Sequence, residues 1–249
     1  MEKYSFSKIH HFYDCPYSFY KRYFLEEKIK ESHGTSEFGT FIHSILEKYE
    51  KNELKLDELA KYYEDNYESN VKSTFILKLS DSFSKDFGYE YYMSGLDYLL
   101  NFDGFKDWTI LESEYEFEEI IQDKFIFTGK IDLIAEDKDK NIIICDHKSK
   151  KKFNSKKEKK EYAKQLYLYS YAVYKKYNKF PKKLIFNMFR NGTYEEIEFN
   201  KKDYNATLEW LESTVEEIET AFDFPAINNT FYCRNFCEYR NQNLLECKK

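Results

Sequence analysis

The chain has 249 residues, a formal net charge of −6, and 34% charged against 42% hydrophobic residues. This length suits one domain, or one domain with an insertion, and it suffices to bury a core without disulfide bonds. No apolar run approaches the roughly 18 residues of a membrane span, and the first residues lack the apolar stretch of a signal peptide. We therefore expect a globular, cytoplasmic protein, and the net charge alone does not indicate binding to nucleic acid.

The first hundred residues show helical spacing of apolar side chains. Residues 4–30 predict a short helical segment, and residues 36–51 predict an amphipathic helix with Ser36 as its N-cap. Residues 56–102 keep tyrosine, phenylalanine and leucine at intervals of three and four. This pattern predicts a helical insertion over about 52–105.

The pattern changes to that of strands near residue 108. Residues 109–121 and 124–136 alternate between apolar and polar side chains, which is typical of half-buried strands. Residues 137–141 have the composition of a hairpin turn, and the apolar run 142–148 suits a central, buried strand.

The remaining elements alternate between helix and strand. A helix is predicted over 158–178, strands over 183–190 and 193–199, and a last helix over about 201–222. The tail 223–249 is irregular and contains three of the five cysteines. This order predicts an α/β fold with a mixed β-sheet flanked by helices.

Two aspartates and a lysine are expected to meet where the central strands pair. Because side chains alternate along a strand, Asp146 and Lys148 point to one face while Cys145 and His147 point to the other. Pairing across the hairpin turn places Asp132 near Asp146. Neighbouring carboxylates repel unless a cation lies between them, and their hard oxygens suit Mg²⁺ or Mn²⁺. A structural alternative is that both aspartates pair with nearby lysines, because this short pattern is common.

The motifs around these residues resemble those of the PD-(D/E)XK nuclease superfamily, in its RecB-like exonuclease branch. This branch includes the AddB-like and the CRISPR-associated iron–sulfur exonucleases. The resemblance implies a restriction-endonuclease-like core, with residues 1–249 as a single nuclease domain and the tail 223–249 packed on the N-terminal helices. The motifs that carry it are, in order, CPYSFY (15–20), GTFIH (39–43), GKID (129–132), DHK (146–148), QLYLY (165–169) and the C-terminal cysteines.

The resemblance also implies the roles of individual residues. Asp132, Asp146 and Lys148 would be catalytic, with Lys148 at the scissile phosphate or the attacking water. The metal ligands would be Asp132, Asp146, the backbone carbonyl of His147, and His43. Strand alternation agrees with the carbonyl, since it turns the His147 side chain away. Without this context, a lone histidine such as His43 on an amphipathic helix would be a structural residue.

A second set of residues is expected to contact DNA or support the site. Gln165 and Tyr169 share a helix face and resemble the QxxxY motif of the family, although a tyrosine-rich core stripe is the alternative. Either Glu112 or Glu114 could match an acidic residue that some members carry on the preceding strand. Because the register of that strand is uncertain, we assign a catalytic role to neither.

A basic segment follows the proposed catalytic lysine. Residues 148–164 contain nine lysines and two glutamates. Lysine contacts to phosphates carry little sequence information, so this segment, with Lys150, Lys151 and Lys152, predicts sequence-independent DNA binding. A solvated surface without a ligand is the alternative.

The cysteines suggest a second metal centre. Cys15, Cys233, Cys237 and Cys247 resemble the one N-terminal and three C-terminal ligands of a [4Fe–4S] cluster in the iron–sulfur branch. The spacing departs from that branch, because Cys233 and Cys237 form CxxxC and nine residues separate Cys237 from Cys247. A zinc site or no metal at all are the alternatives. Cys145 lies in the apolar strand and is interpreted as a small core residue.

Together these features predict a Mg²⁺- or Mn²⁺-dependent DNA exonuclease acting on single strands or DNA ends. Recombination, repair, phage DNA processing and CRISPR adaptation would all use such an activity. Two alternatives are a non-catalytic nucleic-acid-binding or assembly module of the same fold and a sequence-specific endonuclease. Strand polarity, protein partners and oligomeric state are not encoded in any motif that we identify.

Overall fold

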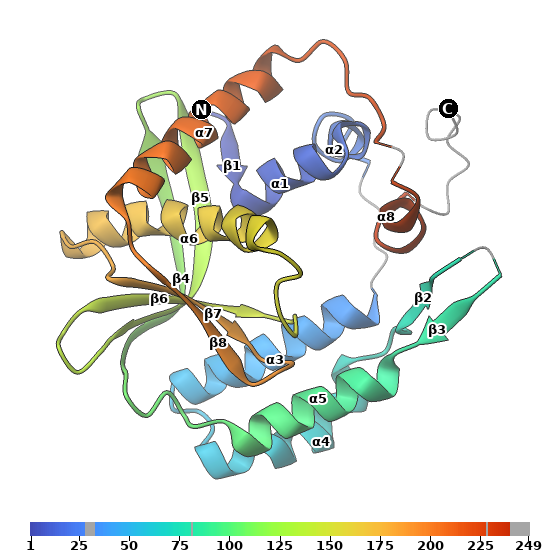
Figure 1. Cartoon of the computed structure of the whole chain (residues 1–249), viewed down its shortest axis with the longest axis vertical. Coiled ribbons are helices and arrows are strands. Elements are labelled where there is room, and N and C mark those ends of the chain that lie inside the picture. Colours follow the sequence, from blue (N-terminus) through green and yellow to red (C-terminus); the bar gives the residue numbers. More distant parts are fainter. Residues whose placement is uncertain (28–32, 81, 228, 240–249) are drawn as a thin grey trace.

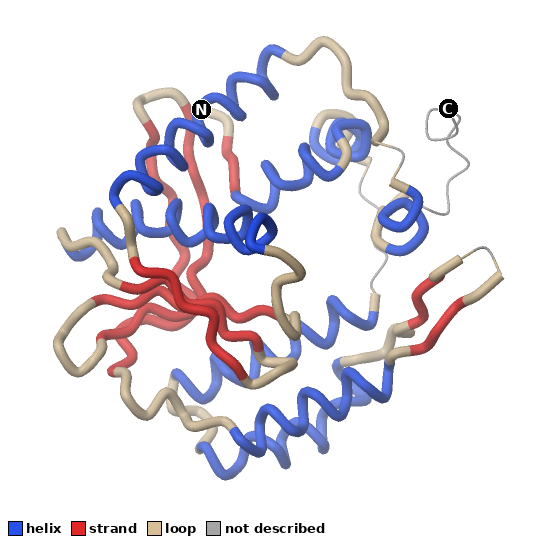
Figure 2. The backbone as a smooth tube through the Cα atoms, in the orientation of Figure 1, coloured by secondary structure: helices blue, strands red, loops and turns tan. Residues whose placement is uncertain are grey.

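A mixed six-stranded sheet forms the centre of the protein in the computed structural model, which describes residues 1–27, 33–80, 82–227 and 229–239 (Figures 1 and 2). The longest pair is antiparallel, with β4 along one edge of β5. The other edge of β5 pairs with β1 in parallel near its start and with β6 in antiparallel fashion near its end. β7 is parallel to β6, and β8 closes the sheet antiparallel to β7. The strands are β1 (Lys3–Ser5), β4 (Thr109–Ile121), β5 (Phe125–Glu136), β6 (Ile142–Lys148), β7 (Lys183–Met188) and β8 (Thr193–Glu198).

Helices cover both faces of this sheet and create two hydrophobic cores (Figure 1). Successive β6 residues serve different cores: Ile144 packs in the first, and Cys145, fully buried as expected, packs in the second. The predicted α/β class with a mixed, helix-flanked sheet is therefore confirmed. The first core involves α1 (Phe6–Asp14), α2 (Pro16–Tyr23), α6 (Lys156–Tyr177) and α7 (Lys201–Thr220), and the second involves α3 (Gly34–Glu50), α4 (Leu59–Asn70) and α5 (Gly88–Asn101).

The helix that carries His43 begins two residues earlier than expected. α3 starts at Gly34, and its N-cap is His33, whose extended backbone lets the ring nitrogen Nδ1 accept the N–H of Thr35. The prediction of Ser36 as N-cap is therefore wrong, because Ser36 already lies in the first helical turn.

The insertion 52–105 is not helical throughout, which corrects the prediction for 56–102. A short 3₁₀ turn (Leu56–Glu58) precedes α4, and a hairpin of β2 (Ile76–Lys78) and β3 (Ser84–Asp86) separates α4 from α5. The Asn235 side-chain amide, far away in the sequence, binds both the N–H and the carbonyl of Lys78. A contact of this kind stabilises a strand that local spacing does not reveal.

At the two chain ends the structure differs from the predicted elements in smaller ways. The segment expected to be helical from residue 4 begins with β1, and the tail contains the short helix α8 (Thr230–Asn235). The described part of the tail lies against the N-terminal helices: the Tyr17 N–H donates to the Pro225 carbonyl, and Arg22 forms an ion pair with Glu238 at 2.8 Å. Within the described residues, no helix is both long and apolar enough to cross a bilayer.

Candidate metal centre

Asp132 and Asp146 lie side by side at the point where the β5–β6 pairing ends. Leu133 pairs with Cys145, so the two aspartates occupy the next position in the register. Both are buried, at 9% and 3% exposed. Burial and the neighbouring Asp146 carboxylate hold the pKa of Asp132 well above its usual range. A cation between the two carboxylates would remove this electrostatic cost.

His43 reaches the same place from α3. Its Nε2 lies 2.9 Å from the His147 carbonyl oxygen and its Nδ1 lies 3.6 Å from Asp132 Oδ2. Burial lowers the pKa of His43 to about 4, so the ring is neutral at pH 7. Because the carbonyl can only accept, Nε2 carries the proton and the Nδ1 lone pair faces a carboxylate oxygen. The lone pairs of His43 Nδ1 and Asp132 Oδ2 therefore point toward one another. This arrangement favours a cation that both atoms bind.

Glu114 completes a group of three candidate ligands. One donor atom each from His43, Glu114 and Asp132 lie within 4.8 Å of one another. Glu114 stands opposite Asp132 in the β4–β5 register, with an unusual backbone φ of 54° and an ion pair to Lys130. Left-handed backbone in a residue other than glycine costs free energy and is frequent at functional sites.

The sequence did not decide whether Glu112 or Glu114 belongs to the site. A β-bulge sets the register of this strand, and local spacing does not reveal a bulge. The register shifts by one residue between Ile110 and Glu112, which brings Glu114 to the level of Asp132. Glu112 pairs instead with Lys176 at 2.5 Å. The signal that could have identified Glu114 is its position across from Asp132, but only the bulge fixes that position.

Asp146 and Lys148 form the second half of the site. Lys148 Nζ lies 2.7 Å from Asp146 Oδ2 and donates to Gln165 Oε1 at 2.9 Å. Gln165 in turn donates to the Tyr169 hydroxyl at 2.8 Å. Asp146 does not belong to the three-residue ligand group, and its carboxylate is held by Lys148. The ammonium group therefore has a defined position beside the two aspartates.

The expected DNA-contacting residues differ in exposure. Tyr169 is only 6% exposed and packs in the core, where its hydroxyl accepts from Gln165. Lys150 is half-buried and pairs with Glu158 at 2.8 Å, which fixes the start of α6. Lys151 and Lys152 are exposed.

A cavity of about 440 Å³ gives access to the site. His43, Glu114 and Asp132 line it together with Lys130 and Ser149. A space of this size is within the range of small-ligand sites. The candidate ligands are therefore reachable from outside although Asp132 is buried.

Gly129 of the GKID motif has a packing role beneath this site. A Cβ atom added there would lie 2.6 Å from the Phe117 ring and 2.8 Å from the Tyr169 ring. We expect Gly129→Ala to lower the free energy of unfolding by roughly 1–3 kcal/mol, as overpacked cores do. Urea unfolding measures this, with Gly39→Ala as the matched control, because its Cβ would meet only Ser149 at 3.5 Å. Equal stability of Gly129→Ala and wild type would show that the rings move aside freely.

Three of the four predicted cluster cysteines fall within the described residues, and Cys247 lies outside them. Cys15 and Cys237 are buried, and Cys233 is partly exposed on α8. Burial and the nearby Cys15 raise the pKa of the Cys233 thiol. The hydrogen bond from the Tyr17 N–H to the Pro225 carbonyl brings the start of α2, next to Cys15, against the tail that carries Cys233 and Cys237.

Comparisons with known proteins identify a family and a fold. The family model of the PD-(D/E)XK nuclease superfamily matches residues 3–242. A crystal structure of a candidate exonuclease from Eubacterium rectale matches with a TM-score of 0.52 and 11% identity, covering 88% of this chain and 80% of that one. At this identity the likeness shows the fold alone. SSO0001 matches with a TM-score of 0.36 and 16% identity over 84% of this chain and 98% of its own, which carries no argument. No curated protein matches the sequence.

Proposed function

The chain belongs to the PD-(D/E)XK nuclease superfamily, and on this premise we propose that it is a metal-dependent DNA exonuclease acting on single strands or DNA ends. Nucleases of this superfamily use divalent metals. The observation that carries the proposal is the convergence of His43, Glu114 and Asp132 beside the Asp146–Lys148 pair. Carboxylate oxygens are suitable ligands for Mg²⁺ or Mn²⁺, and the imidazole nitrogen of His43 favours the transition metal Mn²⁺ over Mg²⁺.

The residues of the site support hydrolysis of a phosphodiester. Water attacks phosphorus, the bond to the leaving oxygen breaks, and negative charge builds on the phosphate oxygens. A bound divalent ion would lower the pKa of that water and stabilise this charge. His43, Glu114 and Asp132 would hold the ion, with Asp146 and the His147 carbonyl next to them. Lys148, which donates to Gln165, would orient the water or stabilise the phosphate charge.

Cleavage of end-labelled DNA tests the function directly. We expect Mn²⁺- or Mg²⁺-dependent release of short products from linear single strands or duplex ends, and no cleavage of closed circles. Cleavage of circles at a fixed site would indicate the sequence-specific endonuclease instead. DNA binding without turnover under any divalent metal would indicate a non-catalytic module.

Sequence-independent binding would depend on the exposed lysines after the active site. We expect replacement of Lys151 and Lys152 by glutamine to flatten the dependence of log K on log salt by about 0.7 for each lost contact to a single strand. Fluorescence anisotropy with a labelled oligonucleotide measures the slope. The control replaces Lys55 and Lys61, both exposed, for the same change in charge. An unchanged slope in the first variant would mean that these lysines do not touch DNA.

A [4Fe–4S] cluster held by Cys15, Cys233, Cys237 and Cys247 forms the second part of the proposal. The contact between α2 and the tail and the burial of Cys15 and Cys237 support it, because cysteine sulfur is a soft ligand that suits an iron–sulfur centre. The cluster would hold the tail on α1 and α2, where Arg22 already pairs with Glu238.

Protein purified without oxygen is expected to be brown and to contain iron and sulfide in equal amounts. Cys233→Ser should remove most of the iron and lower the melting temperature, whereas Cys145→Ser, in the separate sheet core, should keep the iron. Colourless wild-type protein without iron, with its thiols intact, would exclude the cluster but not the nuclease.

A further inference from the structure

The backbone of one residue, His147, bonds to two of the candidate metal ligands. Its N–H donates to Asp132 Oδ2 at 2.7 Å, and its carbonyl accepts from His43 Nε2 at 2.9 Å. The position of this single residue therefore influences where both ligands lie. Whatever fixes residue 147 also fixes the geometry of the metal centre.

The imidazole of His147 is fixed on the opposite face of the sheet. Its side chain is 1% exposed, and Nε2 lies 3.1 Å from Glu50 Oε1. Asn187 Nδ2 lies 3.1 Å from Nδ1, and the Phe105 ring stacks on the imidazole with centroids 6.0 Å apart. A carboxylate oxygen can only accept, so Nε2 donates its proton to Glu50 Oε1.

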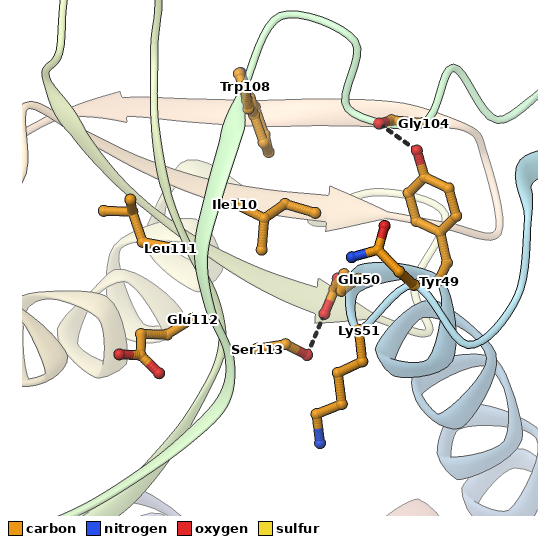
Figure 3. Close-up of a pocket in the computed structure, with 10 residues that line it drawn as sticks. Tyr49, Glu50, Lys51, Gly104, Trp108, Ile110, Leu111, Glu112 and Ser113 are labelled. Carbon is orange, nitrogen blue, oxygen red and sulfur yellow. Dashed lines mark hydrogen bonds between the residues drawn. The ribbon is translucent and has the colours of Figure 1, made fainter.

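Glu50 also connects α3 to β4, the two elements that supply His43 and Glu114. Its second oxygen, Oε2, accepts the hydroxyl proton of Ser113 at 2.6 Å (Figure 3). Ser113 immediately precedes Glu114 on β4, and Glu50 lies seven residues after His43 on α3. Two turns of helix span about 10 Å, so α3 is held against residue 147 at two separated points. One buried carboxylate therefore joins α3, β4 and β6.

Stability alone gives little reason to keep this buried charge. Taking a carboxylate and a histidine out of water costs several kcal/mol, and well-packed apolar replacements are often as stable. A role in geometry explains the pair better, because α3 and β4 carry His43 and Glu114, and β6 carries the His147 N–H that binds Asp132.

We propose that Glu50 is a positioning residue of the metal centre. By binding Ser113 and His147 it keeps α3, β4 and β6 at the separation at which His43, Glu114 and Asp132 share one ion. This inference rests on the metal centre of the proposed function, but it does not depend on the identity of the substrate.

The test compares Mn²⁺ affinity in Glu50 variants by isothermal titration calorimetry. Glu50→Ala removes both contacts and should weaken Mn²⁺ binding by roughly 10- to 100-fold, as loss of a ligand's supporting partner does. Glu50→Gln can still accept from His147 and donate to Ser113, so it should stay within about threefold of wild type. A cavity of about 530 Å³ borders Glu50 and Ser113, so water can enter after truncation. Glu53→Ala, exposed just beyond α3, is the control.

A purely structural role would lower the melting temperature of Glu50→Ala and leave the Mn²⁺ affinity of the folded protein unchanged. That result would overturn the proposal. If Glu50→Ala does not fold, Ser113→Ala replaces it. Ser113→Ala removes only the hydrogen bond between Glu50 and β4, so it should weaken Mn²⁺ binding by roughly threefold or more. Wild-type affinity in that variant would also overturn the proposal.

Mn²⁺ binding is measured without DNA, so the two proposals can fail separately. Wild-type protein that binds Mn²⁺ but cleaves no DNA would reject the proposed function and leave the role of Glu50 testable. A nuclease whose Glu50→Ala variant keeps full Mn²⁺ affinity would reject the role of Glu50 alone.

Discussion

Asp132→Asn is expected to abolish DNA cleavage while making the metal-free protein more stable. Cleavage should fall by roughly 10³-fold or more, because loss of a metal ligand removes several kcal/mol of transition-state stabilisation. The amide oxygen can still accept the His147 N–H, so the β5–β6 junction should remain intact. Removing a buried charge that Asp146 repels should stabilise the fold by on the order of 1 kcal/mol.

The gain in stability should depend on pH in a defined direction. Folding raises the pKa of Asp132 above its ordinary value of about 4, so the folded state binds this proton more tightly than the unfolded chain. The contribution of Asp132 to wild-type stability is therefore lost as pH rises from about 4 towards neutrality. The difference between Asp132→Asn and wild type should be near zero at the acidic end of this window and should grow with pH.

Urea unfolding with a chelator at several pH values measures this difference, and end-labelled DNA measures cleavage. Mn²⁺ should raise the melting temperature of wild type but not of the variant, because only a binding site in the native state stabilises it. Asp139→Asn, in the exposed β5–β6 turn, makes the same change in charge and should alter none of these quantities. If Asp132→Asn cleaves DNA as fast as wild type, Asp132 is not a ligand of the catalytic metal.

Lys148→Met should separate catalysis from metal binding. The ammonium group lies beside Asp146 and is oriented by Gln165, so its loss should lower kcat by roughly 10²- to 10⁴-fold. Mn²⁺ affinity should not weaken, because removing a positive charge next to the carboxylates reduces the repulsion of a cation. DNA affinity should change little, because one contact among many is lost.

Single-turnover cleavage and Mn²⁺ titration of the same preparation check this prediction. Gln165→Leu, which keeps Lys148 but removes its hydrogen bond, should lie between wild type and Lys148→Met. Lys61→Met, exposed on α4, is the control for charge and should keep the wild-type kcat. If Lys148→Met loses Mn²⁺ binding together with cleavage, then Lys148 supports the metal centre rather than the chemical step.

Local sequence patterns were sufficient to predict most strands of the sheet and the long helices that pack on it. Residues 109–121 and 142–148 were predicted with the bounds that the structure has, since alternation and a buried apolar run are properties of the strands themselves. The adjacency of Asp132 and Asp146 also followed, because a short turn leaves antiparallel strands little choice of partner. The hairpin between α4 and α5 did not follow, because Asn235 stabilises it from 157 residues away.

By itself the sequence determined the α/β class, the strand pair that carries Asp132 and Asp146, and the lysine that follows them, since each depends on periodicity or on neighbours along the chain. Only the tertiary structure decided that Glu114 joins His43 and Asp132, because a one-residue bulge in β4 sets that register. Only the tertiary structure, again, placed the Glu50 carboxylate between Ser113 and His147. Such contacts join residues that no local spacing relates, and their free energy comes from packing between elements rather than from preferences within one.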